Sequence, residues 1–309
     1  MAVCMRVCYG APATRCYTAC MQRPLGNLGV SVAPIGLGGM PLSIQGRPDE
    51  STALAVIAAF LEGGGTHIDT AISYCLDEAD FGHNERLIAK ALRTLRRRDI
   101  VVATKGGLTR PNGRWEVDCS PMWLRRCCEQ SARDLGGPIA LYYLHTVDPA
   151  VPLADSVGEL VRLRDEGKIL SIGVSNVDAR QLDEALRLTP IAAVQNRCNV
   201  LDRRDFDSGL VDRCRELGIA YVPYSSVGGH GGHRRLAQQP TLARIAAKHS
   251  TSIYVIAVAW LLAKGAHILP IPGATKVASV TSSLSAEGVL LDSDDVAALD
   301  KLGAARRAH

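Results

Sequence analysis

The chain has 309 residues, of which 47% are hydrophobic and 21% are charged, so it is long enough to bury a sizeable core. Its longest apolar stretch, residues 253–263, is about half the roughly 20 residues that a membrane-spanning helix needs, and no span is predicted. The formal net charge of +4 comes from residues 1–48, which hold four arginines and no acid, and the near-neutral remainder argues against nucleic-acid or anionic-membrane partners.

Residues 1–24 precede the first patterned sequence and are expected to lie outside the folded core. They hold four of the ten cysteines, at a spacing that matches no common zinc pattern: Cys4, Cys8, Cys16 and Cys20. No apolar segment typical of a secretory signal precedes them, so a disulfide framework is not predicted. Because Met21 lies directly before the patterned sequence, we expect a disordered extension or a mis-assigned start in a cytoplasmic protein. A transit peptide within residues 1–20 stays open, and a metal or redox role is less favoured.

From residue 25 onward, short apolar runs alternate with amphipathic windows of helical period. Strands are predicted at residues 34–37, 66–69, 100–104, 140–144, 169–174, 191–195, 220–223 and 267–271. Helices are predicted near residues 51–62, 83–96, 121–134, 154–166, 178–187, 205–217 and 240–264. Eight strands that alternate with helices within about 250 residues are typical of a (β/α)8 barrel. We therefore predict a single α/β domain over residues 25–309, a TIM barrel that opens with a short N-terminal β-hairpin.

Individual segments carry the signals behind this assignment. In residues 153–166 the apolar side chains recur at a period of about 3.6, and Gly167 follows where a helix would end. Ser120 followed by Pro121 is typical of a helix start, because serine accepts an orphan amide bond and proline tolerates the first helical position. The glycine-rich run 36–39 lacks the G-x-G-x-x-G spacing, and no helical pattern begins before Ser51. A doubly wound dinucleotide-binding sheet is therefore rejected.

Polar and ionisable side chains gather where the predicted strands end, which is where the active site of a parallel barrel lies. These positions are Asp69, Tyr74, Lys105, His145, Ser175, Asn176, Gln195, Tyr224 and Ser225. Each alone has an ordinary structural explanation, such as a helix cap for Asp69, a solvated charge for Lys105 or a core histidine for His145. Four ionisable residues at one rim are harder to explain in this way, because burying charges costs several kcal/mol unless they pair.

Asp69, Tyr74, Lys105 and His145 together suit the reduction of a carbonyl group. This reaction needs a hydride donor and a proton donor, and a tyrosine of pKa about 10 is a weak acid near neutrality. A lysine ammonium about 4 Å away would stabilise the tyrosinate by up to roughly 4 kcal/mol and so lower the pKa of the tyrosine. Asp69 would keep Lys105 charged, and His145 would hydrogen-bond the carbonyl oxygen.

Several stretches, in their order and spacing, resemble the aldo-keto reductase family from about Leu25 to the C-terminus. They are HIDTAISY with GHNERLIAKAL, VVATKGG, YYLHTVD, ELVRLRDEGKILSIGVSN, VQNRCNVLDR and PIPGATK. The resemblance implies a catalytic tetrad of Asp69, Tyr74, Lys105 and His145, with Tyr74 as the general acid. It also implies a nicotinamide cofactor, whose carboxamide would be held by Ser175, Asn176 and Gln195 and whose ring would stack on Tyr224.

The resemblance extends to the rest of the cofactor. Ser225, Ser226 and the glycine-rich loop 227–232, which includes Gly228, would approach the pyrophosphate. The remaining expected contacts are Gly273, Thr275, Lys276, Ser279 and Ser283. The family commonly places an arginine where this chain has Ser279, and its loss removes a partner of the 2′-phosphate. NADPH is therefore the expected cofactor, with NADH or dual use as the alternative.

The expected substrate is a small aldehyde or ketone. Met40, after the first strand, and Trp115, in the long loop after the third, are candidate pocket walls, although Trp115 would serve equally as an anchor for that loop. WEVDCSP and YYLHTVDPAVPLADS are similar to the bacterial-type branch that includes pyridoxal reductases and sugar or general aldehyde reductases. Cys75 is interpreted as a small apolar filler rather than a redox sensor. We expect a monomer or a small homo-oligomer.

Two other classes of protein are weighed against the reductase. A cofactor-binding regulatory barrel, like the potassium-channel β subunits that resemble this family, would show little turnover, but the chain has no patterned hydrophobic extension to serve as a partner surface. A metal-dependent barrel hydrolase or aldolase would use His145 and Asp148. Only one histidine lies in that loop, and no metal site is predicted.

Overall fold

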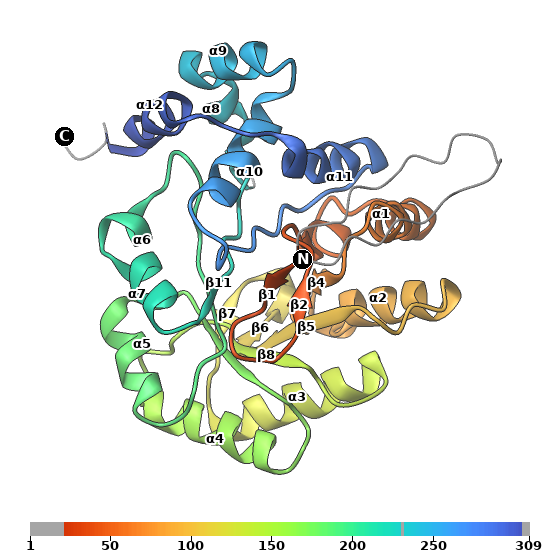
Figure 1. The fold of residues 1–309 in the computed structure, drawn as a ribbon. Coiled ribbons are helices and arrows are strands. Elements are labelled where there is room, and N and C mark those ends of the chain that lie inside the picture. Colours follow the sequence, from red (N-terminus) through yellow and green to blue (C-terminus); the bar gives the residue numbers. More distant parts are fainter. Residues whose placement is uncertain (1–21, 230–231, 305–309) are drawn as a thin grey trace, which may run out of the picture.

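A computed structural model describes residues 22–229 and 232–304, and the expectations for residues 1–21 lie outside them. Seven parallel strands form one curled sheet, around which the helices lie (Figure 1). The order of the strands in this sheet is β11-β10-β9-β8-β5-β4-β3. The strands are β3 (Leu37–Gly38), β4 (His67–Asp69), β5 (Val101–Gly106), β8 (Leu141–Leu144), β9 (Ile172–Ser175), β10 (Ala193–Gln195) and β11 (Ala220–Tyr221). The predicted (β/α)8 barrel is confirmed, and its active-site end is the one where these strands terminate.

The eighth strand of the barrel differs from the prediction, because residues 267–271 form no regular strand. Single bridges join Tyr221 to Ile268 and Gly38 to Gly273, and so close the barrel between β11 and β3. Pro270 and Pro272 lack the amide hydrogen that a ladder needs, and only their carbonyl oxygens accept hydrogen bonds, from Gly36 and Gly38. The closure is tight: a Cβ on Gly38 would lie 2.7 Å from the carbonyl oxygen of Ile271.

The predicted N-terminal hairpin is present as β1 (Arg23–Pro24) and β2 (Ser31–Val32), which pair antiparallel. The Arg23 guanidinium donates hydrogen bonds to the carbonyl oxygens of Gly265 and Ile268, both at 2.8 Å, and of Leu262 at 3.1 Å. Leu25 and Val32 join the apolar interior of the barrel. The hairpin therefore seals the end opposite the active site, and β1 starts before residue 25, where the domain was expected to begin.

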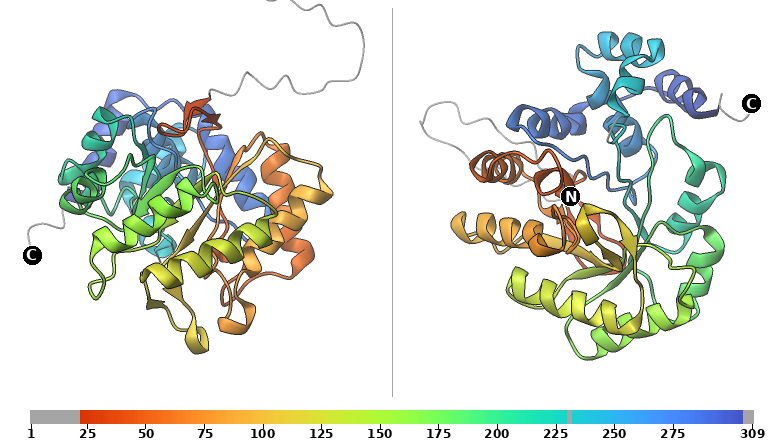
Figure 2. Two further views of the ribbon diagram at one scale, coloured as in Figure 1. Left: turned by 90° about the horizontal axis from the view of Figure 1, so that it is seen from below. Right: turned by 180° about the vertical axis from the view of Figure 1, so that it is seen from behind.

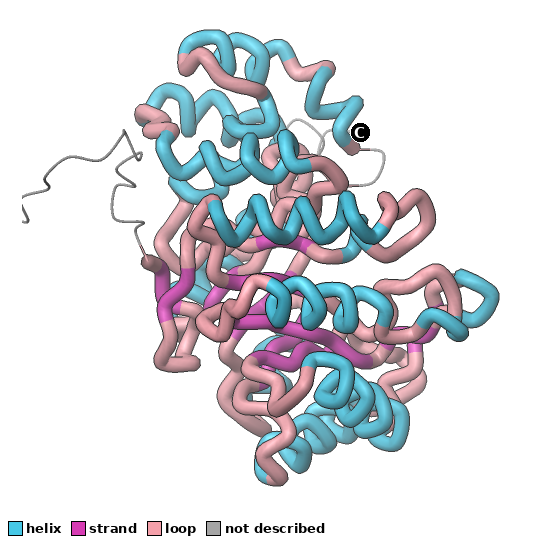
Figure 3. Tube along the Cα trace, turned by 90° about the vertical axis from the view of Figure 1, so that its right-hand side faces the viewer, coloured by secondary structure: helices cyan, strands magenta, loops and turns pink. Residues whose placement is uncertain are grey.

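Helices pack around the sheet, and the strands lie between them in the side view (Figures 2 and 3). The first seven are α1 (Glu50–Glu62), α2 (His83–Thr94), α3 (Pro121–Leu135), α4 (Leu153–Asp165), α5 (Ala179–Leu186), α6 (Arg204–Asp207) and α7 (Leu210–Glu216). Ser120 caps α3 as predicted, accepting a hydrogen bond from the amide of Trp123, and Pro121 is the first helical residue. The single helix predicted at 205–217 is wrong: Gly209, with φ of +82°, separates α6 from α7.

The C-terminal part holds α8 (His233–Ala237), α9 (Pro240–Lys248), α10 (Ile253–Ala263), α11 (Val277–Leu284) and α12 (Ser293–Ala304). The helix predicted at 240–264 is two helices at 87° to each other, with Ser250 in the left-handed region between them. Helices α8, α11 and α12 were not predicted. Among the described residues no single helix is long and apolar enough to cross a membrane; α9 and α10 reach that limit only as a bent pair, by length and composition alone.

Short elements complete the rim around the active-site end. The hairpin β6 (Leu108–Thr109) and β7 (Glu116–Val117) was not predicted, and it carries Trp115 in its turn. The 3-10 helices are η1 (Met40–Leu42), η2 (Glu78–Asp80), η3 (Pro111–Gly113) and η4 (Ser285–Gly288). Of these, η1 follows β3 and η2 follows β4, so both lie in loops at the carboxyl ends of strands.

Candidate active site

Four buried ionisable side chains meet at the carboxyl ends of neighbouring strands. Asp69 ends β4, Lys105 lies near the end of β5, His145 follows β8 directly, and Tyr74 lies in the loop after β4. The exposed fractions of these residues are 4% for Asp69, 0% for Lys105, 8% for His145 and 6% for Tyr74. The predicted convergence of the four residues is therefore what the parallel sheet produces, because adjacent strands end at one rim.

Lys105 links Asp69 to Tyr74 within this cluster. Its Nζ donates to Asp69 Oδ2 at 2.7 Å, to the Thr70 carbonyl oxygen at 2.8 Å and to Tyr74 Oη at 3.0 Å. An ammonium has three hydrogens, and each has a partner here. The phenol oxygen of Tyr74 accepts from Lys105, so the phenol proton is left for another acceptor. The His145 ring packs edge-on against the Tyr74 ring, with centroids 5.8 Å apart.

Burial governs the pKa values of the site. It raises the pKa of Tyr74 well above its ordinary value, and the Asp69 charge raises it further. Burial lowers the pKa of His145 well below its ordinary value, with a smaller effect of the Lys105 charge, so the imidazole is neutral. Burial also raises the pKa of Asp69 and lowers that of Lys105, while their ion pair opposes both shifts.

The expectation that Lys105 lowers the pKa of Tyr74 is therefore wrong for this arrangement. The ammonium lies 2.7 Å from a carboxylate oxygen of Asp69, which offsets its charge as seen from the phenol. The desolvation of the tyrosinate then dominates. As a result Tyr74 holds its proton at neutral pH and is available as a hydrogen-bond donor.

Residues after β9, β10 and β11 connect to this cluster. Gln195 Nε2 donates to Asp69 Oδ1 at 2.7 Å, and Ser175 Oγ donates to the Gln195 carbonyl oxygen at 2.7 Å. Asn176 Nδ2 donates to the carbonyl oxygen of His145 at 2.9 Å, and Tyr224 Oη donates to Asn176 Oδ1 at 2.7 Å. Asn176 has a φ of +57°, in the left-handed region that non-glycine residues rarely adopt and that is enriched at functional sites.

A cavity of about 540 Å³ opens above these residues, within the usual size range of ligand sites. Most predicted site residues line it: Met40, Asp69, Tyr74, Trp115, His145, Ser175, Asn176, Gln195, Tyr224, Ser225, Ser226, Gly273 and Thr275. Lys105 lies beneath the cavity floor. Val227, from the loop expected at the pyrophosphate, also lines it. Ile44, Gln45, Gly46, Leu108 and His233 line it too and were missed, because nothing in their spacing marks them.

Four predicted cofactor contacts lie away from the lining of this cavity. Lys276 precedes α11, and Ser279 and Ser283 lie on it. Gly228 lines a separate hollow of about 590 Å³, together with Arg197. Their roles stay predictions. Asp148 was the candidate residue for a metal-dependent hydrolase or aldolase. Its carboxylate accepts hydrogen bonds from the backbone amides of Cys119 and Ala150 and so stabilises the loop.

The cavity suits an elongated cofactor with an aromatic head. The Tyr224 ring forms a wall whose hydroxyl is fixed by Asn176, and amide groups of Asn176 and Gln195 lie beside it. Further along, Gly229 and Gly273 line the cavity without side chains; a Cβ on Gly273 would meet the Pro41 ring at 2.7 Å. His145 Nδ1 is buried and has no hydrogen-bond partner among the described residues. The residues present therefore fit a nicotinamide nucleotide.

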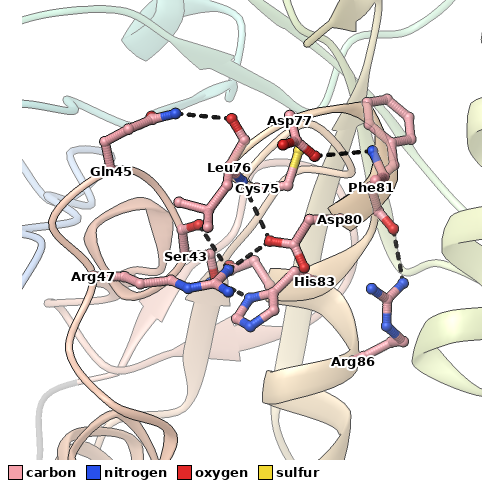
Figure 4. A network of polar contacts seen from close by, with 12 residues as sticks. Ser43, Gln45, Arg47, Cys75, Leu76, Asp77, Asp80, Phe81, His83 and Arg86 are labelled. Atoms are coloured by element: carbon pink, nitrogen blue, oxygen red, sulfur yellow. Dashed lines mark hydrogen bonds and ion pairs between the residues drawn. The ribbon is translucent and has the colours of Figure 1, made fainter. Parts of the chain in front are cut away.

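A polar network fastens the loop that carries Tyr74 to the loop after β3 (Figure 4). Arg47 forms an ion pair with Asp80 at 2.5 Å, and Gln45 Nε2 donates to the Leu76 carbonyl oxygen at 2.8 Å. The His83 ring hydrogen-bonds Ser43 Oγ at 2.8 Å. These contacts hold two walls of the cavity together.

Comparison with known proteins gives a consistent match. The model of the Aldo/keto reductase family matches residues 34–304. "Probable aldo-keto reductase 1" of Glycine max is 33% identical over 302 residues, which cover 88% of this chain and 86% of that protein. The solved structure of the thermostable aldo-keto reductase Tm1743 with the inhibitor epalrestat has a TM-score of 0.78 and 30% identity, covering 92% of this chain and all of that one. An aldo/keto reductase of Klebsiella pneumoniae, solved with NADP and acetate, has a TM-score of 0.75 and 25% identity, covering 91% and 94%.

Proposed function

Because the chain belongs to the aldo/keto reductase family of oxidoreductases, we propose that it reduces an aldehyde or ketone to the alcohol with NADPH, and that Tyr74 supplies the proton. The observation that carries this proposal is the three-way contact of Lys105 with Asp69, Thr70 and Tyr74 beneath a cavity that fits a nicotinamide nucleotide. When bound, this cofactor would supply the hydride that reduces the carbonyl carbon.

The chain's own residues would orient the carbonyl group and move the proton. The Tyr74 hydroxyl accepts a hydrogen bond from Lys105, so its proton is free to point into the cavity toward a carbonyl oxygen. Neutral His145 stands beside it and would donate a second hydrogen bond to the same oxygen, fixing its angle. As negative charge develops on that oxygen, the Tyr74 proton moves to it, and the ammonium of Lys105 stabilises the phenolate that is left.

The cofactor would be held by the residues that link β9, β10 and β11. Asn176 and Gln195 offer amide groups for a carboxamide, the Tyr224 ring offers a stacking face, and Ser225 and Thr275 line the path beyond. NADPH is preferred over NADH because the Klebsiella pneumoniae relative was solved with NADP and because Lys276 follows Thr275. Ser279, where the family commonly has arginine, weakens this preference.

The test is to follow NADPH and NADH oxidation by the purified full chain with a panel of short, branched and aromatic aldehydes, and to identify the alcohol product. Sustained turnover with alcohol equal to the cofactor consumed supports the proposal. Oxidation of a single equivalent of cofactor with every carbonyl compound would instead indicate the regulatory barrel.

A further inference from the structure

Arg110 is a charged residue in a loop, yet it is only 1% exposed. It follows β6 and precedes η3, in the hairpin segment that carries Trp115. Its Nη2 donates to Gln45 Oε1 at 2.7 Å and to the Leu76 carbonyl oxygen at 3.1 Å. Its Nε and Nη1 have no hydrogen-bond partner, and no carboxylate lies within ion-pair distance of it among residues 22–229 and 232–304. A buried cation of this kind needs some other source of stabilisation.

The partner of the buried cation is an aromatic ring. The guanidinium carbon of Arg110 lies 3.8 Å from the centroid of the Trp115 ring, well within cation–π range. The Cys75 thiol also interacts with Arg110, but burial raises the pKa of this thiol to about 12, so it stays neutral and adds no counter-charge. A desolvated cation–π contact is stronger than one exposed to water, and arginine makes it with a flat face that lysine lacks.

Arg110 therefore joins three parts of the cavity wall. Gln45 and Trp115 both line the cavity, and Leu76 lies two residues after Tyr74. The Gln45 side chain also donates a hydrogen bond to the Leu76 carbonyl oxygen (Figure 4). The free edge of this wall is Trp115, which is 45% exposed and meets the Tyr74 ring at 81° with centroids 6.4 Å apart. Within this set of contacts Tyr74 meets the indole at a steep angle, and the Arg110 guanidinium is the group that stacks on its face.

We propose that Arg110 is a positioning residue, which fixes the orientation of the Trp115 indole where this ring lines the cavity beside Tyr74. Arg110 would thereby determine how well the site accepts bulky carbonyl compounds. The inference rests on the proposed carbonyl reduction. A small aldehyde at Tyr74 and His145 does not need this wall, whereas a large aromatic aldehyde extends along it. Arg110 thus separates substrates by size without touching the reacting atoms.

The experiment compares propanal with 2-naphthaldehyde in the wild type, Arg110→Met, Arg110→Lys and Arg114→Met. Arg114 is the matched control, because it lies in the same hairpin with its side chain 70% exposed. Both Arg110 variants are expected to lose about tenfold or more in kcat/KM for 2-naphthaldehyde, mainly through KM, while propanal and Arg114→Met change by less than about twofold. Equal losses for both aldehydes, or no loss for either, would overturn the proposal.

A second readout does not depend on turnover. Trp115 is one of three tryptophans, so acrylamide quenching is measured in a Trp123→Phe background, where Trp260 is fully buried. Release of the indole in Arg110→Met is expected to raise the quenching constant about twofold, with Arg114→Met unchanged. If the wild type reduces neither aldehyde, the proposed function fails, and quenching alone decides whether Arg110 positions Trp115. An unchanged quenching constant overturns the inference.

Discussion

The ion pair of Lys105 with Asp69 contributes separately to catalysis and to folding stability, and the substitution Lys105→Met tests both contributions. At 3.0 Å and an effective dielectric near 20, the ammonium stabilises a tyrosinate by at most about 5 kcal/mol, and the Asp69 charge reduces this figure. We expect kcat to fall by about 10²- to 10⁴-fold, the usual range for impairing a general acid. The same change leaves the Asp69 carboxylate buried without its cation, which costs about 3–5 kcal/mol of folding stability.

A double variant separates these effects. Lys105→Met combined with Asp69→Asn removes the uncompensated charge, so the free energy of unfolding is expected to recover by about 2 kcal/mol or more while turnover stays low. Steady-state rates with NADPH and an accepted aldehyde measure kcat, urea unfolding measures stability, and NADPH fluorescence titration checks that the cofactor still binds. The reasoning is refuted if Lys105→Met keeps kcat within about tenfold of wild type, or if the double variant regains activity along with stability.

Two further changes test the fold around the site. Burial raises the pKa of Glu85, which accepts a hydrogen bond from Thr104 beside Lys105, to about 7 from 4.5. The folded state therefore binds the proton more tightly than the unfolded state, and stability falls as pH rises from about 4.5 to 7, by about 3 kcal/mol in all. Glu85→Gln should remove this part of the pH dependence of urea midpoints, with exposed Glu116→Gln as the control; parallel pH curves for Glu85→Gln and wild type would contradict it. Gly38→Ala places a Cβ 2.7 Å from the Ile271 carbonyl oxygen and should cost about 1–3 kcal/mol of stability, whereas Gly137→Ala, with open space around it, should not destabilise; equal thermal midpoints for the two variants would show that the barrel closure is not tight there.

The barrel and the four-residue cluster were predictable because both depend on local periodicity. Asp69, Lys105 and His145 come at the ends of apolar runs, and parallel strands bring their carboxyl ends together whatever the surrounding loops do. The helix start at Ser120 was equally local. Features of this kind depend on a few consecutive residues, so they can be predicted without knowledge of tertiary contacts.

The differences arise where distant segments decide the outcome. Residues 267–271 resemble a strand in composition, but Pro270 and Pro272 flank Ile271 and leave only bridges. Residues 240–264 read as one helix because α10 is apolar on all sides, which reflects its burial rather than its length. Helix α11 was missed because it buries only Val280.

The pKa values and the burial of charged residues depend on tertiary contacts even more than the element boundaries do. The pKa of Tyr74 was expected to fall because only the charge of Lys105 was taken to act on the phenol, whereas burial and the Asp69 charge raise that pKa. Nothing in the sequence marks Arg110, and its burial is explained by its stacking on Trp115 together with its hydrogen bonds to Gln45 and Leu76.

The central claim is that Tyr74 gives its proton to the substrate. The most direct measurement is single-turnover oxidation of bound NADPH by an aldehyde in Tyr74→Phe, alongside the affinity for NADPH. We expect the rate to fall by about 10²-fold or more while the NADPH Kd stays within about threefold of wild type, because the phenol oxygen is lost but the ring remains. A Tyr74→Phe variant that turns over as fast as wild type would contradict the account, and the proton donor would have to be another group in the cavity.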